Sequence, residues 1–206
     1  MLRVGLTGSI GVGKSFVSSV LAELGCRVLD ADRTAREVVA AGSAGLRAVV
    51  EAFGTEVLRA DGTLDRARLG AIVFADEKKR LLLNSILHPF IIAAQDEQLS
   101  RWEEEDAEGI AVVDAALMIE SGGYRRFDKL IVVHCRPEIQ VERLMARNAI
   151  SREEAERRIK AQMPQEEKMR YADFLIDSSH GFEDTRRRAA EVFAQLRKLA
   201  GESKGK

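Results

Sequence analysis

The stretch Gly8-Ser9-Ile10-Gly11-Val12-Gly13-Lys14-Ser15 decides the fold of this chain. Its spacing, G-x-x-x-x-G-K-S, is that of a phosphate loop, which joins a buried strand to the start of a helix. The glycines let backbone N–H groups wrap closely around an anion, and the helix N-terminus points further N–H groups at it. Apolar residues at positions 2, 4 and 6, and again at 17, 20, 21 and 24, predict the flanking strand and helix. We therefore expect a protein that binds a nucleoside triphosphate, rather than a glycine-rich turn that binds nothing.

The loop also predicts how the triphosphate is held. Lys14 is placed to bridge the β- and γ-phosphates, and the Ser15 hydroxyl is placed to contact Mg²⁺. The expected nucleotide-binding residues are Gly8, Ser9, Ile10, Gly11, Val12, Gly13, Lys14, Ser15 and Phe16.

Composition sets the class of protein. The chain has 206 residues, 46% of them hydrophobic and 32% charged, with a net charge of -1. Such a balance gives no global positive field, so we expect no nucleic-acid partner. Cys26 and Cys135 have no ligands at zinc spacing and are expected to be buried thiols. Neither a signal-peptide pattern nor an apolar run of membrane-spanning length is present, so we expect a cytoplasmic protein without a membrane partner.

Short apolar runs alternate with helical patterns, which predicts an α/β fold. Residues 2–7, 27–30, 110–114, 130–134 and 174–177 are rich in Val, Ile and Leu without strict alternation, as in a parallel sheet covered on both faces. We expect a parallel five-stranded sheet flanked by helices, as in P-loop nucleoside triphosphate hydrolases and nucleoside monophosphate kinases. The predicted organisation is a single domain, residues 1–200, followed by a frayed tail, 201–206. Its core comprises residues 1–32, 110–137 and 173–200, with a helical acceptor lobe at about 33–109 and a helical lid at about 138–172.

The acceptor lobe has three predicted features. Apolar stripes at 46, 49, 50 and 53, and at 69, 72 and 73, indicate two helices. Asp76 is placed to cap a third helix, with residues 81, 82, 86 and 87 on its core side. Pro89 is expected to break or restart that helix, so that the next one begins near residue 90.

The lid region combines a capping box, Ser151 with Glu154, with many Arg and Lys residues interleaved with Glu. Two interpretations are equally open for the region: a solvated surface stabilised by i,i+4 charge pairs, or a lid that closes over the triphosphate. For Arg147 we favour the lid.

Three carboxylates follow predicted strands, at the sheet edge where ligands bind in such folds. Asp32 is placed either to accept the proton of an attacking hydroxyl or to cap a helix that begins near Arg33. Asp114 is either an acidic partner of hydrated Mg²⁺ or a turn residue, and Asp30 ends the second strand. There is no N-K-x-D guanine signal, and the chain is short for an ATP-driven motor, so a small-molecule kinase remains.

Several segments then resemble the dephospho-coenzyme A kinase family, in order and over nearly the whole chain. The matching stretches are Asp30-Ala31-Asp32 with Ala35-Arg36, His88-Pro89, residues 114–120, 124–128, 140–147, 158–164 and Lys168, and 172–177. The resemblance implies transfer of a phosphoryl group from ATP, with Mg²⁺, to the ribose 3′-hydroxyl of dephospho-CoA, which completes coenzyme A.

The resemblance also implies residue roles. Asp32 becomes the general base, Lys14 holds the phosphates, and Arg147 acts on the transferring phosphoryl group, with Arg143 nearby on the nucleotide. The implied acceptor-binding residues are Thr7, Asp32, Arg36, His88, Leu117, Glu120 and Tyr124. Two alternatives stay open: His88 as a structural residue at a helix end, and Leu117 with Met118 as plain core.

The chain departs from the family pattern at three places. Phe16 replaces a hydroxyl residue, Ala116 replaces a proline, and Ser178-Ser179-His180 replaces N-S-G near the expected adenine position.

Two other functions remain as alternatives: a P-loop kinase acting on a nucleoside, nucleotide or sugar acid, and a nucleotide-dependent binding protein without catalysis. We expect a monomer or a weak homo-oligomer.

Overall fold

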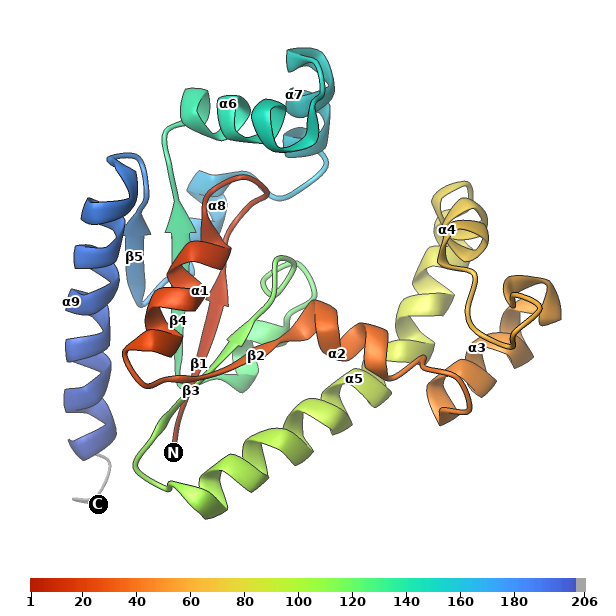
Figure 1. Ribbon diagram of the computed structural model, residues 1–206, viewed down its shortest axis with the longest axis horizontal. Coiled ribbons are helices and arrows are strands. Elements are labelled where there is room, and N and C mark those ends of the chain that lie inside the picture. The colour runs from red at the N-terminus through yellow and green to blue at the C-terminus, as the bar shows by residue number, and fades with distance from the viewer. Residues whose placement is uncertain (203–206) are drawn as a thin grey trace. The chain divides into compact units, whose positions relative to one another are not determined.

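The structure is a computed structural model in which residues 1–202 are described (Figure 1). It divides into two compact units. The first comprises Met1–Leu29 and the described residues from Trp102 onward, and the second comprises Asp30–Arg101.

The first unit is built on the sheet that the sequence predicts. Within residues 1–202 the sheet has five strands in the order β2-β3-β1-β4-β5. β1 pairs in parallel with β3 and β4, and β4 pairs in parallel with β5. The strands are β1 (Leu2–Thr7), β2 (Arg27–Asp30), β3 (Ile110–Asp114), β4 (Lys129–His134) and β5 (Phe174–Asp177). The predicted α/β fold is confirmed, and β1, which carries the phosphate loop, lies at the centre of the sheet.

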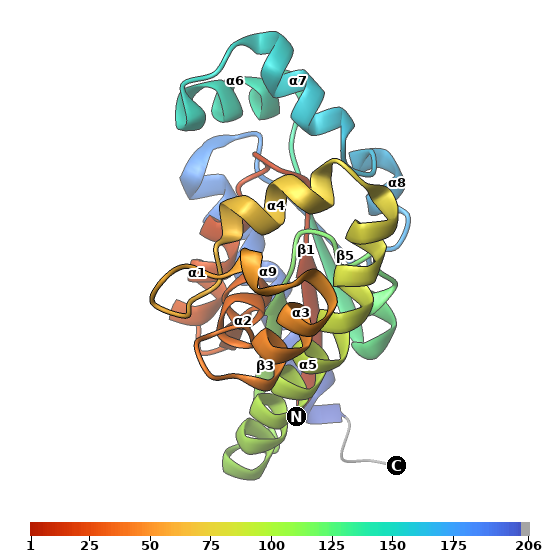
Figure 2. The same cartoon turned by 90° about the vertical axis from the view of Figure 1, so that its right-hand side faces the viewer.

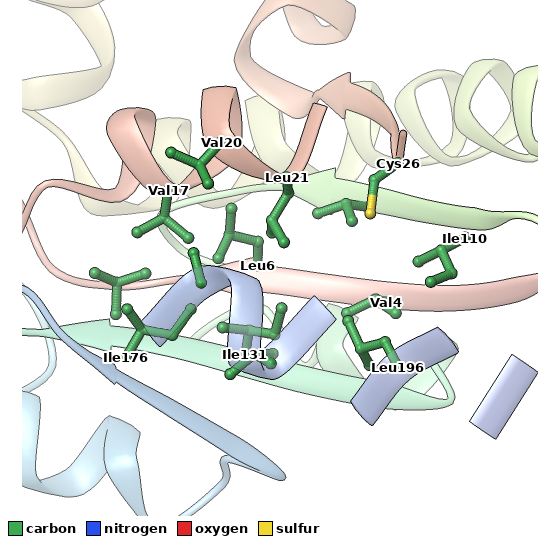
Figure 3. Packing of buried hydrophobic residues seen from close by; sticks show 14 of the residues in the cluster. Val4, Leu6, Val17, Val20, Leu21, Cys26, Ile110, Ile131, Ile176 and Leu196 are labelled. Carbon is green, nitrogen blue, oxygen red and sulfur yellow. The ribbon is translucent and has the colours of Figure 1, made fainter. Parts of the chain in front are cut away.

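The main core lies between this sheet and two helices, α1 (Lys14–Glu23) and α9 (Gly181–Glu202). Figure 3 shows Val4, Leu6 and Ile131 of the strands packed among side chains of α1 and α9. Burial of each Val, Leu or Ile side chain stabilises the fold by about 1.5–3 kcal/mol. Cys26 and Cys135 are both free thiols and both buried, as predicted.

Three helices connect β4 to β5: α6 (Pro137–Asn148), α7 (Arg152–Lys160) and α8 (Gln165–Met169). Two views show α6 and α7 side by side beyond the carboxyl end of β4 (Figures 1 and 2). Leu144 of α6 and Ala155 of α7 share a small buried cluster. The Ser151 hydroxyl accepts the Glu154 N–H at 3.2 Å, which confirms the predicted cap. Glu154 also pairs with Arg157 and Arg158, so part of the charge in this region is neutralised along α7.

The second unit is helical. It contains α2 (Ala31–Glu37), α3 (Ala44–Phe53), the short 3₁₀ helix η1 (Thr55–Val57), α4 (Arg66–Phe74) and most of α5 (Glu77–Glu105). Apolar side chains of α3 and α4 form its core, as their stripes predict. Asp76 accepts the Lys78 and Lys79 N–H groups and so starts α5, as expected.

Two predictions about α5 are wrong. Leu81 and Leu82 are 58% and 44% exposed, whereas Ile86 and Leu87 pack against the core, because the buried stripe lies on one face only. The helix also continues through Pro89 instead of breaking there. A proline inside a helix costs about 3 kcal/mol, and Leu83, Ile86 and Leu87 of the preceding turns pack against the core of this unit.

In the first unit, the 3₁₀ helix η2 (Gly123–Arg126) follows β3. Gly201 and Glu202 of the predicted tail belong to α9, and residues 203–206 lie outside the described part of the chain. Among the helices of residues 1–202, none combines the length and apolar character needed to cross a bilayer.

Candidate functional site

The phosphate loop connects Thr7, the last residue of β1, to Lys14, the first residue of α1. Gly11 and Gly13 both have φ of 83°, a left-handed conformation that only glycine adopts readily. Gly8 is needed for a different reason. A Cβ there would lie 2.5 Å from the Val133 carbonyl oxygen of β4, so only glycine permits this close approach.

Side chains from distant parts of the first unit brace the loop. Gln140 of α6 donates to the Ile10 carbonyl at 2.7 Å, and the Ile10 N–H donates to Gln162 Oε1 at 2.8 Å. The Ser178 hydroxyl donates to the Val12 carbonyl at 2.7 Å. No role was predicted for these three residues, because a Gln or Ser that braces a loop carries no spacing signal. All three lie in or beside segments that resemble the family.

Lys14 and Asp114 form an ion pair at the carboxyl edge of the sheet. The Asp114 residue is 8% exposed, and it ends β3 beside the central strand. Asp114 therefore faces the phosphate loop and is more than a turn residue. Ser15, the second residue of α1, is exposed at the mouth of the loop.

Two arginines project from consecutive turns of α6. Arg143 donates to the Ser178 hydroxyl at 2.9 Å and to the Ser178 carbonyl at 2.8 Å, so its guanidinium is fixed beside the phosphate loop. Arg147 is exposed, and its Nε donates to Asn148 Oδ1 at 2.9 Å. The structure therefore places one cation at the loop and a second one turn further along the same helix.

The segment after β5, where the chain departs from the family pattern, is well ordered by hydrogen bonds. The Ser179 hydroxyl accepts the Arg136 N–H at 2.9 Å, and the Ser179 N–H donates to Asp177 Oδ1 at 2.9 Å. Burial raises the pKa of Asp177, but hydrogen bonds from Ser179 outweigh it and leave the pKa lowered. Burial of His134 lowers its pKa, so its imidazole is neutral at pH 7.

Phe16, the other departure beside the loop, turns its ring toward α9. The ring meets that of Phe182 edge to face, with centroids 4.8 Å apart, and the Arg186 guanidinium lies 5.8 Å from its centre. The side chain therefore contributes packing between α1 and α9 where a hydroxyl would contribute a polar contact.

The segment after β3 carries the acceptor residues expected in this unit. Thr7 is buried, and its hydroxyl donates to the Ala116 carbonyl at 3.2 Å. Leu117 is 54% exposed whereas Met118 is 3% exposed, so only Met118 belongs to the core. Tyr124 meets the ring of Tyr171 edge to face at 5.2 Å. Glu120 pairs with Lys168, a fully buried lysine to which the sequence had assigned no role.

The remaining expected residues lie in the second unit. Asp30, not Asp32, caps α2: its carboxylate accepts the Asp32 and Arg33 N–H groups at 2.8 and 3.2 Å. The alternative that Asp32 caps a helix is therefore wrong, and its side chain stands exposed on the first turn. Arg36 is also exposed. His88 is exposed inside α5, so the alternative of a helix-terminal histidine is wrong as well.

The side chains near the phosphate loop decide which metal ion could bind there. Among residues 1–202 no group of three or more His, Cys, Asp or Glu side chains is arranged to hold an ion. Ser15 and Asp114 offer a hydroxyl and a carboxylate, the hard oxygen donors that suit Mg²⁺. Mg²⁺ is usually held by one or two protein oxygens together with substrate phosphates, and this pair fits that pattern.

Comparisons with known proteins point to one family. A family model described as dephospho-CoA kinase matches residues 2–184. A dephospho-CoA kinase of Streptomyces avermitilis is 45% identical over 95% of this chain and 94% of its own length. One from Bacillus thuringiensis is 48% identical over 85% of this chain and 87% of its own length. The structure of a dephospho-CoA kinase from Campylobacter jejuni superposes with a TM-score of 0.73 at 29% identity, covering 95% of this chain and 97% of its own. The chain belongs to the dephospho-CoA kinase family.

Proposed function

We propose that this protein transfers the γ-phosphoryl group of ATP to the ribose 3′-hydroxyl of dephospho-CoA, giving coenzyme A. The observation that carries the proposal is the complete phosphate loop, with Lys14 held by Asp114, in a chain that matches the family over residues 2–184. A phosphate loop with its lysine holds the phosphates of the nucleotide in enzymes that transfer phosphoryl groups.

Nucleotide binding is assigned to the first unit. Backbone N–H groups from Gly8 to Phe16 are proposed to hold the phosphates, and Lys14 to exchange its contact with Asp114 for one with the β- and γ-oxygens. Arg143, fixed at the loop by Ser178, adds a second positive charge. Arg147 is proposed to reach the transferring group when α6 and α7 close over it, which also excludes water.

Proton transfer is assigned to Asp32. Its exposed carboxylate follows the carboxyl end of β2 by two residues, and Asp30 takes the capping role that would otherwise occupy it. A carboxylate in this role orients the acceptor hydroxyl and accepts its proton, which contributes about 10²–10⁴-fold to the rate. The proposed acceptor contacts are Thr7, Arg36, His88, Leu117, Glu120 and Tyr124.

Ser15 is proposed as the protein ligand of Mg²⁺, with Asp114 as an acidic partner of the hydrated ion. When bound, Mg²⁺ would supply neutralisation of the phosphate charge. Lys14 and Arg143 are proposed to neutralise phosphate charge as well, so that the transferring group lies among several positive charges.

The test is acceptor specificity. Purified protein with ATP and Mg²⁺ is offered dephospho-CoA, adenosine or a sugar acid in parallel, and products are separated by chromatography. Formation of coenzyme A with little transfer to the other two supports the proposal. Efficient transfer to adenosine or to the sugar acid would assign another small-molecule kinase activity, and ATP binding without transfer would assign a binding protein.

A further inference from the structure

Lys168 is a buried lysine that the proposed mechanism does not use. Its side chain is 0% exposed, and its ammonium donates to the Ala116 carbonyl at 2.8 Å and pairs with Glu120 Oε1 at 2.8 Å. A buried ammonium is destabilising unless it is paired and hydrogen-bonded. Its two contacts therefore hold the Lys168 side chain in one position. Both partners of Lys168 lie in the segment that follows β3.

That segment, residues 115–120, is also joined to the central strand. The Ala115 N–H donates to the Leu6 carbonyl at 3.0 Å, and the Thr7 hydroxyl donates to the Ala116 carbonyl at 3.2 Å. The Ala116 carbonyl therefore accepts from β1 and from Lys168 together. Lys168 also reaches further along the segment than this contact, because its ammonium pairs with Glu120.

The stretch that leads to Lys168 contacts the phosphate loop at its other end. Gln162 accepts the Ile10 N–H at 2.8 Å, and the Met163 carbonyl accepts the Ser9 hydroxyl at 3.4 Å. The Met163 N–H donates to Glu120 Oε1 at 3.4 Å. We call residues 162–168 the cross-segment: it contacts the phosphate loop through residues 162 and 163, and the acceptor segment, residues 115–120, through 163 and 168.

We propose that Lys168 is a positioning residue for the acceptor: it holds the acceptor segment, while Gln162 at the other end of the cross-segment holds the phosphate loop. The inference rests on the proposed function, because it takes residues 117 and 120 as part of the acceptor site. Loss of Lys168 leaves the Ala116 carbonyl and the Glu120 carboxylate without this donor. Loss of Gln162 leaves the Ile10 N–H without this acceptor. The two ends are therefore expected to affect different substrates: loss of Lys168 weakens binding of the acceptor, and loss of Gln162 weakens binding of ATP.

The experiment compares Lys168→Met with Gln162→Ala in the full chain, measuring kcat and KM for both substrates and the Kd of ATP by direct titration. Lys168→Met is expected to raise the KM for dephospho-CoA about ten- to hundredfold, the range for losing hydrogen bonds to a charged group, and to leave the ATP Kd unchanged. Gln162→Ala is expected to raise the ATP Kd about fivefold, the value for a neutral hydrogen bond, and to leave the acceptor KM unchanged.

Two variants serve as controls. Lys160→Met removes an exposed lysine from α7 and is expected to change none of these constants. Lys168→Arg keeps the charge and donors, and is expected to recover part of the acceptor affinity that Lys168→Met loses. A purely structural role would instead lower the amount of folded protein and leave both KM values of the remainder unchanged.

If Lys168→Met does not fold, Lys168→Gln gives the same test, because it removes the charge but keeps a polar N–H donor on the side chain. It is expected to raise the acceptor KM and to leave the ATP Kd unchanged. Equal rises in both substrate constants, or a fall in kcat alone, would overturn the inference. A wild-type protein that makes no coenzyme A would overturn the proposed function instead, so the two failures are distinguishable.

Discussion

Replacement of Gly8 by alanine tests how closely the phosphate loop is packed on the sheet. The new Cβ would lie 2.5 Å from the Val133 carbonyl oxygen and 2.9 Å from Val12 Cγ2. The first neighbour is backbone inside β4 and cannot rotate away, so β1 and β4 must separate locally. Overpacking of this kind costs about 1–3 kcal/mol. For a chain of this length each kcal/mol lowers Tm by about 2–4 °C, so Gly8→Ala is expected to lower Tm by roughly 2–12 °C.

The assay is thermal unfolding with and without ATP. The displaced loop is expected to bind ATP more weakly, so the rise in Tm that ATP gives the wild type is expected to shrink in Gly8→Ala. The matched control is Gly70→Ala in the interior of α4, where a Cβ would come no closer than 3.7 Å to the Phe74 ring. That variant is expected to gain about 0.5–1 kcal/mol. A Gly8→Ala protein with wild-type Tm and wild-type ATP stabilisation would refute the packing argument.

Three further predictions follow from single side chains. Lys14→Ala is expected to weaken ATP binding and to lower kcat/KM on the order of 10²–10³-fold, as for loss of one preorganised charge-stabilising donor; steady-state kinetics with undiminished kcat/KM would contradict this. Burial lowers the pKa of His134, so the folded protein favours the neutral imidazole. The free energy of unfolding is therefore highest above the unfolded pKa of about 6.5 and decreases as the pH falls below it. Urea unfolding of His134→Gln is expected to depend less on pH between about 7 and 5 than the wild type, and an unchanged pH dependence would exclude His134 as the cause. Burial raises the pKa of Cys26 to about 12, so alkylation of this thiol at pH 8 is expected to require unfolding; rapid labelling of Cys26 in the native protein, read by mass spectrometry, would show that it is accessible.

The strands and the phosphate loop were predictable because their signals are local. The five apolar runs correspond to β1–β5, with the fourth starting one residue earlier than predicted. A loop of fixed glycine spacing between an apolar run and a helical stripe has one common structural solution. Asp76 and Ser151 were recognised as caps for the same reason, since a cap is decided by its nearest residues.

Other features depend on packing between distant residues, and the sequence predicted them poorly. Pro89 breaks an isolated helix, but α5 continues through it because its neighbours are held by the core of the second unit. Asp30 and Asp32 are both plausible caps in sequence, and only the backbone decides that α2 begins at Ala31. The cross-segment was not anticipated either, because Gln162 and Lys168 meet partners that are distant in the sequence.

The most direct test of the account is coenzyme A formation by the wild type and by Asp32→Asn, measured alongside ATP binding by each protein. The wild type is expected to convert dephospho-CoA and ATP to coenzyme A. The variant is expected to bind ATP as well as the wild type but to turn over about 10²–10⁴-fold more slowly, because it lacks the base. A variant that forms coenzyme A at the wild-type rate would remove Asp32 from the base role. A wild type that binds ATP and forms no coenzyme A would contradict the proposed function itself.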